Sequence, residues 1–308
     1  MSRRGWLLFI SLCVIWGLPY LLIRVAVREL PPPALIFLRT TPAALLLVPL
    51  ALHRRELRPL LARWRWVAGY TVVEIALPWL LLAHAEVRIS SSLAGLVVGA
   101  VPLIAAVLYR ALGAGEQFDA RRIAGLLVGF AGVAALVGID VVGSDPLAVA
   151  EMLVVAVCYA SGPLIISRPL AGLPTLGVIT ASLALTAVAY APAGLLTMPA
   201  SVSAQTVGAV ATLSLLCTVL AFFLFFALIG EVGPSRSTVI TYVNPLVAVL
   251  LGVVLLSEPL TLGIAVGMPL ILVGSVLGTA PSLRKASARE GELTTGAETD
   301  PAASPPTP

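Results

Sequence analysis

The sequence predicts an all-α polytopic membrane protein whose ten transmembrane helices form two inverted five-helix repeats. Hydrophobic residues make up 59% of the 308 positions and charged residues 11%, whereas soluble domains average roughly 45–50% and 25%. The apolar residues fall into runs of about 18–24, the length that a helix needs to cross a hydrocarbon core. The two halves also match each other at an offset of 142 residues, from Glu116 to Glu258 (258 − 116).

Ten apolar windows bounded by polar or helix-breaking residues are the predicted spans. Helices are expected because backbone groups in hydrocarbon must be hydrogen-bonded within the segment, and the runs lack the alternation of a membrane barrel. The windows are Trp6–Ile23, Pro33–Leu52, Trp66–Ala83, Ser91–Tyr109, Ile123–Ile139, Pro146–Ile166, Leu176–Met198, Val207–Gly230, Ser237–Leu256 and Leu260–Ala280.

Basic residues gather on one side of the predicted membrane. If the N-terminus is cytoplasmic, fifteen of the nineteen lysines and arginines are cytoplasmic, Arg24, Arg28 and Arg88 are external, and Arg39 lies within a span. Cytoplasmic loops carry excess Lys and Arg, so the bias predicts a multi-pass protein of the cytoplasmic (inner) membrane with both termini cytoplasmic. The acidic loop at 140–145 is then external. The fifteen are Arg3, Arg4, Arg54, Arg55, Arg58, Arg63, Arg65, Arg110, Arg121, Arg122, Arg168, Arg236, Arg284, Lys285 and Arg289.

Three units follow from composition and from the repeat. Residues 1–140 form the first predicted five-helix repeat, and residues 141–280 form the second, inverted one. Residues 281–308 are rich in Ser, Thr, Pro, Gly, Ala and Glu, with almost no large apolar side chains. That composition predicts a disordered cytoplasmic tail.

A short series of residues near the end of each half carries the repeat. The Glu-to-Gly spacing is nine in both copies (125 − 116 and 267 − 258), and the Gly-to-Gly spacing is seven in both (132 − 125 and 274 − 267). Self-similarity at a fixed offset indicates a duplicated structural unit. The matching residues are Pro102, Glu116, Gly125 and Gly132 in the first half and Pro245, Glu258, Gly267 and Gly274 in the second.

Each unit holds five predicted helices, an odd number, so the second copy must enter the membrane upside down. Inverted repeats that enclose a site near the bilayer midplane are typical of secondary transporters, which work by alternating access. The sequence therefore predicts transport of a small-molecule substrate through a lipid-embedded bundle. Pro102 and Pro245, which occupy matching places, are candidate helix-break or gating positions.

Small-residue motifs allow helices to approach closely. They serve either a homodimer face or packing within one chain, and ten helices to pack favour the second use. The four motifs are Gly95/Gly99, Gly125/Gly129, Gly263/Gly267 and Gly274/Gly278.

The motifs resemble those of the drug/metabolite transporter superfamily, in particular its EamA-like family. The resemblance covers roughly Trp6 to Ala280 and rests on the combined order of several segments. It implies a 5+5 inverted-repeat fold with a central cavity, and export of small metabolites, amino acids or toxic compounds. Arg39 has no counterpart in the second half, where Ala181 stands, so a site there should be asymmetric. The matching segments are IWGLPYLLIR (15–24), LRTTPAALLL (38–47), the Pro102…Gly115-Glu116…Gly125…Gly132 series and VNPLVAVLLGVVLLSEPLT (243–261).

Ionisable residues within spans cost about 2.5–3.5 kcal/mol each on insertion scales, so each is a functional candidate. The three are Arg39, Glu74 and Glu151. Glu151 lies near the outer end of its helix and ranks lower. Glu74 is nearest the middle of its span, and Arg39 on the neighbouring helix differs from it in depth by only about 4 Å at 1.5 Å per residue.

Two readings of Glu74 stay open. In the first, it faces the cavity and binds a cationic amino group or exchanges a coupling proton, as a buried carboxylate can. In the second, it forms a structural ion pair with Arg39.

Aromatic and amide side chains are further candidates for the pocket, although packing or an interfacial belt is the favoured role for each one taken singly. Glu116 and Glu258 recur at helix junctions, where each is expected to accept hydrogen bonds from backbone N–H groups at the start of the following helix. The further pocket candidates are Trp16, Tyr20, Tyr70, Trp79, Tyr159, Tyr242 and Asn244.

Other functions lack their chemistry in this sequence. An intramembrane enzyme needs a nucleophile–base pair or metal cluster, yet the two histidines, His53 and His84, lie near span ends, and no H-E-x-x-H or G-x-S-x-G occurs. No P-loop, cofactor motif or basic nucleic-acid face is present, so we expect no metal, no cofactor and no nucleic-acid partner. An intramembrane enzyme and a membrane sensor or scaffold without transport remain the alternatives.

Overall fold

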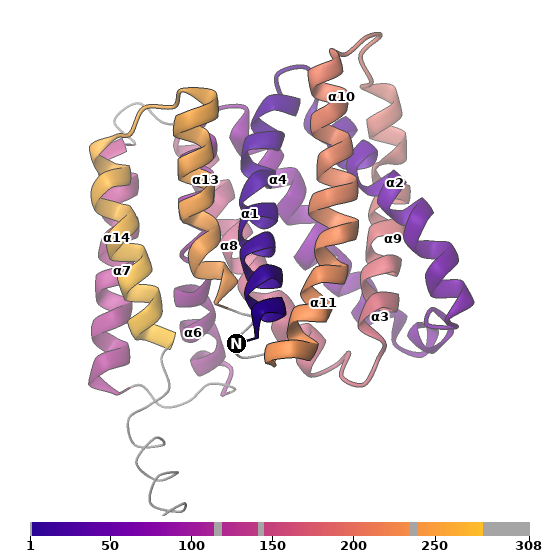
Figure 1. Ribbon diagram of the computed structural model, residues 1–308, viewed down its shortest axis with the longest axis horizontal. Coiled ribbons are helices and arrows are strands. Elements are labelled where there is room, and N and C mark those ends of the chain that lie inside the picture. The colour runs from indigo at the N-terminus through magenta and orange to yellow at the C-terminus, as the bar shows by residue number, and fades with distance from the viewer. Residues whose placement is uncertain (1, 114–118, 141–144, 234–238, 280–308) are drawn as a thin grey trace, which may run out of the picture.

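The computed structural model describes residues 2–113, 119–140, 145–233 and 239–279, and all regular structure in these ranges is helical. Figure 1 shows the helices running side by side as one bundle, with α7 and α14 at one side and α2 and α9 at the other. Several sequence expectations lie outside the described residues. These are the placement of Arg236, Arg284, Lys285 and Arg289, the local role of Glu116, the central part of the acidic loop at 140–145 and the tail at 281–308.

The first half contains five apolar helical stretches, and two of them are irregular. The third is continuous from a 3₁₀ turn through a π-helical segment to α4, and the fourth is broken between α5 and α6 at residues 99–100. The elements are α1 (Arg3–Ala26), α2 (Pro32–His53), η1 (Arg58–Arg63), α3 (Trp64–Tyr70), η2 (Thr71–Ala76), α4 (Leu77–Glu86), α5 (Ser91–Val98), α6 (Val101–Ala111) and α7 (Ala120–Asp140).

The second half repeats this order with a π-helical segment in its third stretch. The predicted windows fall on these helices, with ends displaced by a few residues, and the ninth helix is described only from Ile240. The elements are α8 (Pro146–Ser167), α9 (Thr175–Leu196), α10 (Ala204–Ala211), η3 (Thr212–Leu220), α11 (Ala221–Val232), α13 (Ile240–Leu256) and α14 (Leu262–Thr279).

Short polar side chains set several helix starts. Ser2, Ser90, Asp145 and Ser203 each accept a backbone N–H from the first turn of the helix that follows. An N-cap of this kind stabilises a helix by about 1 kcal/mol because it satisfies a donor that has no partner within the helix. Pro31 takes the same position before α2, where no side chain caps the helix.

Hydroxyl groups bond to both π-helical segments, from a neighbouring helix in η2 and from within the segment in η3. In η2, the carbonyl of Ala76 accepts a hydrogen bond of 3.0 Å from the hydroxyl of Tyr190 on α9, and the Thr71 hydroxyl donates to Ser182 at 2.9 Å. In η3, the Thr218 hydroxyl donates to the carbonyl of Leu213, five residues earlier, at 2.9 Å. These bonds satisfy polar groups that would otherwise be costly to bury.

The glycine motifs bring helices from the two halves together within one chain. A methyl group at Gly274 would overlap the backbone of Gly129 and lie 2.7 Å from the carbonyl oxygen of Gly125, so α7 and α14 touch backbone to backbone. Gly95 of α5 lies against the side-chain methyl group of Ala248 of α13. The expectation of packing within one chain is met at these positions.

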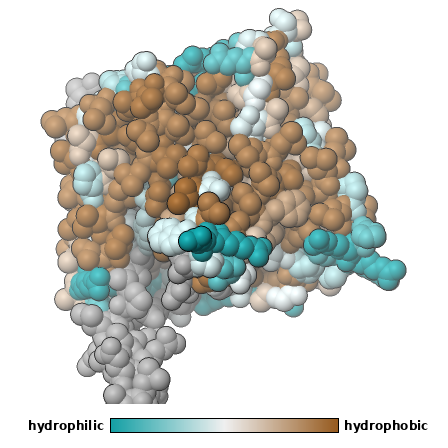
Figure 2. All heavy atoms as spheres, viewed as in Figure 1, coloured by the Kyte–Doolittle hydropathy of each residue, from teal (hydrophilic) through white to brown (hydrophobic). Residues whose placement is uncertain are grey.

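The surface of the bundle is apolar around its middle. Figure 2 shows a broad hydrophobic band across the viewed face, with hydrophilic residues toward its upper and lower edges. Large apolar side chains are widely exposed among the described residues, among them Leu45 at 70%, Leu127 at 68% and Val188 at 73%. An exposed apolar surface of this extent fits lipid rather than water as the solvent.

Seven helical stretches in the described residues are long and apolar enough to cross a membrane, and two shorter apolar helices cover 240–256 and 262–278. The chain is therefore a multi-pass helical membrane protein, as its sequence predicts. α7 is a further helix of 21 residues. The count of ten spans stays a prediction.

Candidate functional site

Arg39 occupies the interior of the bundle, in the second turn of α2. Its side chain is 5% exposed, and its guanidinium carbon lies 3.6 Å from the ring centroid of Trp79 on α4. No hydrogen bond or ion pair within the described part of the chain uses its donors, and Nε is buried without a partner. Arg39 is thus a buried cation held against an aromatic face.

Tyrosines from two other helices are electrostatic neighbours of this cation. Tyr20 of α1 and Tyr159 of α8 both interact electrostatically with Arg39, as does Cys217 of η3. A desolvated cation–π contact contributes about 2 kcal/mol, whereas the effective penalty for burying an ion is several kcal/mol. The contact with Trp79 therefore offsets only part of the cost of burying the Arg39 charge. A bound anion would offset more of that cost.

Glu74 lies in η2, so the π-helical turn carries the predicted central carboxylate. Its side chain packs directly over Gly162 of α8, where a methyl group would overlap Oε2 and come within 2.7 Å of Cδ. Oε2 is buried and has no hydrogen-bond partner. Tyr70, Tyr109 and Tyr159 are its electrostatic neighbours, together with Cys158. Gly162 therefore provides the space that the carboxylate occupies.

The second reading of Glu74, an ion pair with Arg39, is not met in the structure. The ion pairs of the described residues do not include either group, and Arg39 faces Trp79 instead. The two residues were expected at similar depths, but the helix that carries Glu74 continues to Glu86. Glu74 therefore lies about 18 Å below the end of that helix, whereas Arg39 lies about 10 Å below the start of α2. Tyr159 is an electrostatic neighbour of both groups.

Glu86 is a buried acid that sequence reasoning missed. The predicted span ended at Ala83, but α4 continues to Glu86, whose side chain is 0% exposed with both carboxylate oxygens lacking a partner. Arg24 donates a hydrogen bond to the backbone carbonyl of Glu86, not to its carboxylate. Hydropathy gave no signal for this, because the apolar window ended at Ala83 while the helix extends three residues beyond it.

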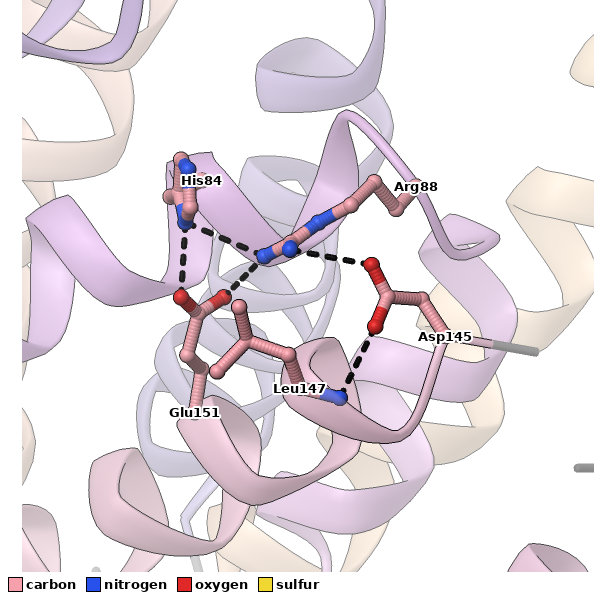
Figure 3. A network of polar contacts seen from close by, with 5 residues as sticks. All are labelled: His84, Arg88, Asp145, Leu147 and Glu151. Carbon is pink, nitrogen blue, oxygen red and sulfur yellow. Dashed lines mark hydrogen bonds and ion pairs between the residues drawn. The ribbon is translucent and has the colours of Figure 1, made fainter.

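Figure 3 shows a polar network that joins the end of α4 to the start of α8. Arg88 bonds Asp145 at 3.0 Å and Glu151 at 2.5 Å, and His84 Nδ1 lies 2.7 Å from Glu151 and 3.0 Å from Arg88. One ring nitrogen cannot donate and accept at once, so the tautomer of His84 decides which contact is favourable. Glu151, ranked low from sequence, is thus tied to its two neighbours at this end of the bundle.

The carboxylate of Glu258 is held at the start of α5. Oε1 accepts from the amide and hydroxyl of Ser91 at 2.8 and 2.9 Å, and Oε2 accepts from those of Ser92 at 2.9 and 2.5 Å. Burial raises the pKa of Glu258, but these hydrogen bonds lower it by more, so its pKa lies below the ordinary value. Hydrogen bonds of this type were expected at the start of the following helix, whereas the helix start that Glu258 contacts is 167 residues earlier in the chain.

Three of the remaining pocket candidates come from α1 and α13. Trp16 packs against Phe222 and Phe225, with ring centroids 6.4 and 4.9 Å away. Asn244 is partly buried on α13 with Oδ1 unpartnered, and Tyr242 lies two residues before it. Trp16 therefore serves an aromatic cluster between α1 and α11.

The two matching prolines differ in their effect on the backbone. Pro102 follows the break at residues 99–100 and starts α6, whereas Pro245 lies inside an unbroken α13. The expected helix break at Pro245 is therefore wrong. Proline near a helix start removes only one hydrogen bond, which a membrane helix tolerates. Pro245 packs against Gly99, 2.9 Å from where a methyl group would stand, and so abuts the break in the fourth stretch.

One protein family matches most of both halves of the chain. The EamA-like transporter family matches residues 3–138 and 147–279. "Uncharacterized transporter YvbV" of Bacillus subtilis (strain 168) is 26% identical over 93% of this chain and 95% of its own length. "Uncharacterized inner membrane transporter YedA" of Escherichia coli (strain K12) is 29% identical over 82% of both. One solved chain, described as "Crystal structure of protein", has a TM-score of 0.63 at 24% identity over 95% of this chain and 100% of its own, which shows the fold alone.

Proposed function

The chain belongs to the EamA-like transporter family, and from this premise we propose that it is a secondary active transporter that exports small metabolites, amino acids or drug-like compounds. Transport proceeds by alternating access and is driven by an ion or substrate gradient, with a proton as the candidate coupling ion. The observation that carries the proposal is a pair of incompletely compensated charges, Arg39 and Glu74, inside a family of transporters. Unpaired ionisable groups within a membrane bundle mark substrate and ion pathways.

The backbone irregularities support two related halves. The π-helical segments begin at Thr71 and Thr212, 141 residues apart (212 − 71), close to the offset of the sequence repeat. π-Helical turns occur frequently at functional sites because they interrupt the regular bonding ladder. The first segment carries Glu74, and the second contains Cys217, which neighbours Arg39.

Reciprocal contacts between α7 and α14 support an inverted relation. A methyl group at Gly132 would lie 3.0 Å from the carbonyl oxygen of Gly267, and one at Gly274 would lie 2.7 Å from that of Gly125. The sequence repeat maps Gly125 onto Gly267 and Gly132 onto Gly274, so each contact is the image of the other. Exchange of this kind is the signature of a two-fold axis, and alternating access needs two such halves to rock about a shared site.

We propose that the end of the bundle bearing Arg3 faces the cytoplasm. The same end carries most of the described arginines, including Arg58 and Arg168, and positive residues favour the cytoplasmic side. Cysteine substitutions at exposed Arg58 and Ser201, at opposite ends, test this with a membrane-impermeant thiol reagent on intact cells. We expect labelling of S201C and protection of R58C, and the reverse pattern refutes the orientation.

We propose that Glu74 is the coupling or cation-binding carboxylate. In proteoliposomes, efflux and uptake of a substrate panel with and without a pH gradient should show pH-driven transport by the wild type. Glu74→Gln keeps the shape but cannot ionise, so it should lose the pH dependence while the protein still folds. Glu231→Gln, an exposed acid at the cytoplasmic end, is the matched control and should behave as wild type.

Two outcomes of that assay would oppose the proposal. Survival of both transport and its pH profile in E74Q excludes Glu74 as the coupling group. Failure of the wild type to move any panel compound, in vesicles that are shown to contain folded protein, favours a sensor or scaffold instead.

A further inference from the structure

Glu86, unlike Glu74, has other charged side chains around it. Its carboxylate interacts electrostatically with Arg24, Arg39 and Glu258, and with Tyr20 of α1. None of these side chains bonds the carboxylate directly, and both of its oxygens are buried without a partner. The neighbouring acid, Glu258, already has four hydrogen-bond donors that hold it as an anion.

The formal charges of Glu86 and its three charged neighbours sum to zero only when Glu86 is ionised. Arg24 and Arg39 contribute two positive charges, and ionised Glu258 contributes one negative charge. With Glu86 ionised the four sum to zero, and with Glu86 protonated they sum to one positive charge. The nearby network of Arg88, Asp145 and Glu151 has its own formal charge of −1 (one arginine and two acids), and none of its members is among the charged groups that interact with Glu86.

Arg39 is the member of the group that can accept a ligand. Its guanidinium carries five N–H donors in a fork that matches a carboxylate, and no group in the described protein uses them. Trp79 covers one face of the guanidinium, and Tyr20 and Tyr159 are its further neighbours. The surroundings thus offer charge for an anion and aromatic surface for an apolar body.

We propose that Arg39 and Glu86 form a linked site that binds a carboxylate anion of apolar or aromatic body on Arg39 together with a proton on Glu86. An incoming anion restores neutrality only when Glu86 is protonated, so each ligand favours the other, and by thermodynamic reciprocity the effect is equal in both directions. The site rests on the proposed transport function, in which it supplies the substrate class and a proton stoichiometry of one. It is 5% exposed or less at both side chains, so the helices must open to load it.

Binding of benzoate to the purified protein in detergent micelles tests the linkage without requiring transport. Benzamide is the neutral counterpart of nearly equal shape, and benzoate remains an anion at both pH 5.5 and pH 7.5. By isothermal titration calorimetry in two buffers of different ionisation heat, we expect benzoate to bind about tenfold more tightly at pH 5.5, with proton uptake, and benzamide not to bind.

Variants separate the two partners. Glu86→Gln should bind benzoate at both pH values with the low-pH affinity of the wild type and without proton uptake, because its side chain is always neutral. Arg39→Gln should abolish benzoate binding, and Arg39→Lys, which keeps the charge should R39Q fail to fold, should retain weaker binding. Glu29→Gln, an acid outside the spans that accepts the backbone N–H of Ser203, is the control and should match the wild type.

Three results would overturn the linked site. They are absence of benzoate binding to folded wild type, equal binding of benzamide, and a pH dependence that persists in E86Q. Transport of a panel compound despite any of these leaves the proposed function intact and removes only this site. Linked benzoate binding without transport of any compound keeps this site and contradicts the proposed transport function.

Discussion

Replacing Glu258 by glutamine should destabilise the fold measurably, because the carboxylate accepts four hydrogen bonds from Ser91 and Ser92 at the start of α5. Glutamine is nearly the same size but keeps only one acceptor oxygen. Its NH₂ group would face one serine amide that can only donate, at a helix end whose dipole favours negative charge.

The expected loss is about 2–3 kcal/mol. A hydrogen bond to a charged group contributes roughly 1.5–3 kcal/mol, and leaving a buried N–H unsatisfied costs about 1–3 kcal/mol. The serine hydroxyls can turn to other acceptors, and Glu258 is itself partly exposed, so the four bonds are not additive. The estimate therefore counts one lost charged bond and one unsatisfied amide at the low end of their ranges.

Unfolding of the purified protein by sodium dodecyl sulfate, followed by circular dichroism, measures this difference. The pKa of Glu258 lies below its ordinary value in the folded protein. Its contribution is therefore fully present above the unfolded pKa of about 4.3 and is lost as pH falls through the folded value. The gap between wild type and E258Q should thus narrow below about pH 4. Equal stability at pH 7, or a gap that is unchanged at pH 3, would refute the reasoning.

Other substitutions test neighbouring parts of the argument. Gly162→Ala should displace the carboxylate of Glu74 and impair transport severalfold while far-UV circular dichroism stays native, whereas unchanged transport would show that the carboxylate position is immaterial. Gly274→Ala should push α14 away from Gly129 and lower stability by about 1–3 kcal/mol, the usual cost of overpacking, as measured by thermal unfolding. Tyr190→Phe removes the bond to the π-helical carbonyl and should cost about 0.5–1 kcal/mol in the same assay, so no change would mean the bond is not formed.

Part of the candidate site could be predicted from the sequence. Arg39 and Glu74 stood out because an ionisable residue inside an apolar window is costly wherever its partners lie. Trp79, Tyr20 and Tyr159 were on the list of aromatic candidates, and in the structure Trp79 contacts Arg39 while both tyrosines are its electrostatic neighbours. Their grouping could not be predicted, because they come from three different helices.

Other parts were missed because they depend on where helices end and cross. Glu86 looked like a loop residue beyond an apolar window, yet three further residues of helix carry it into the interior. Glu258 was expected to act locally, but the helix start nearest to it in space belongs to the other half of the chain.

By itself, the sequence determined that this chain is a multi-pass helical membrane protein and roughly where its helices lie. Those features follow from the length and polarity of local segments, because in lipid each segment must satisfy its own backbone. Only the tertiary structure decided that Arg39 faces Trp79, that Glu74 lies over Gly162 and that Glu258 holds the start of α5. Such partners are set by the crossing of helices distant in the chain, and the spacing of residues along one helix carries no information about that crossing.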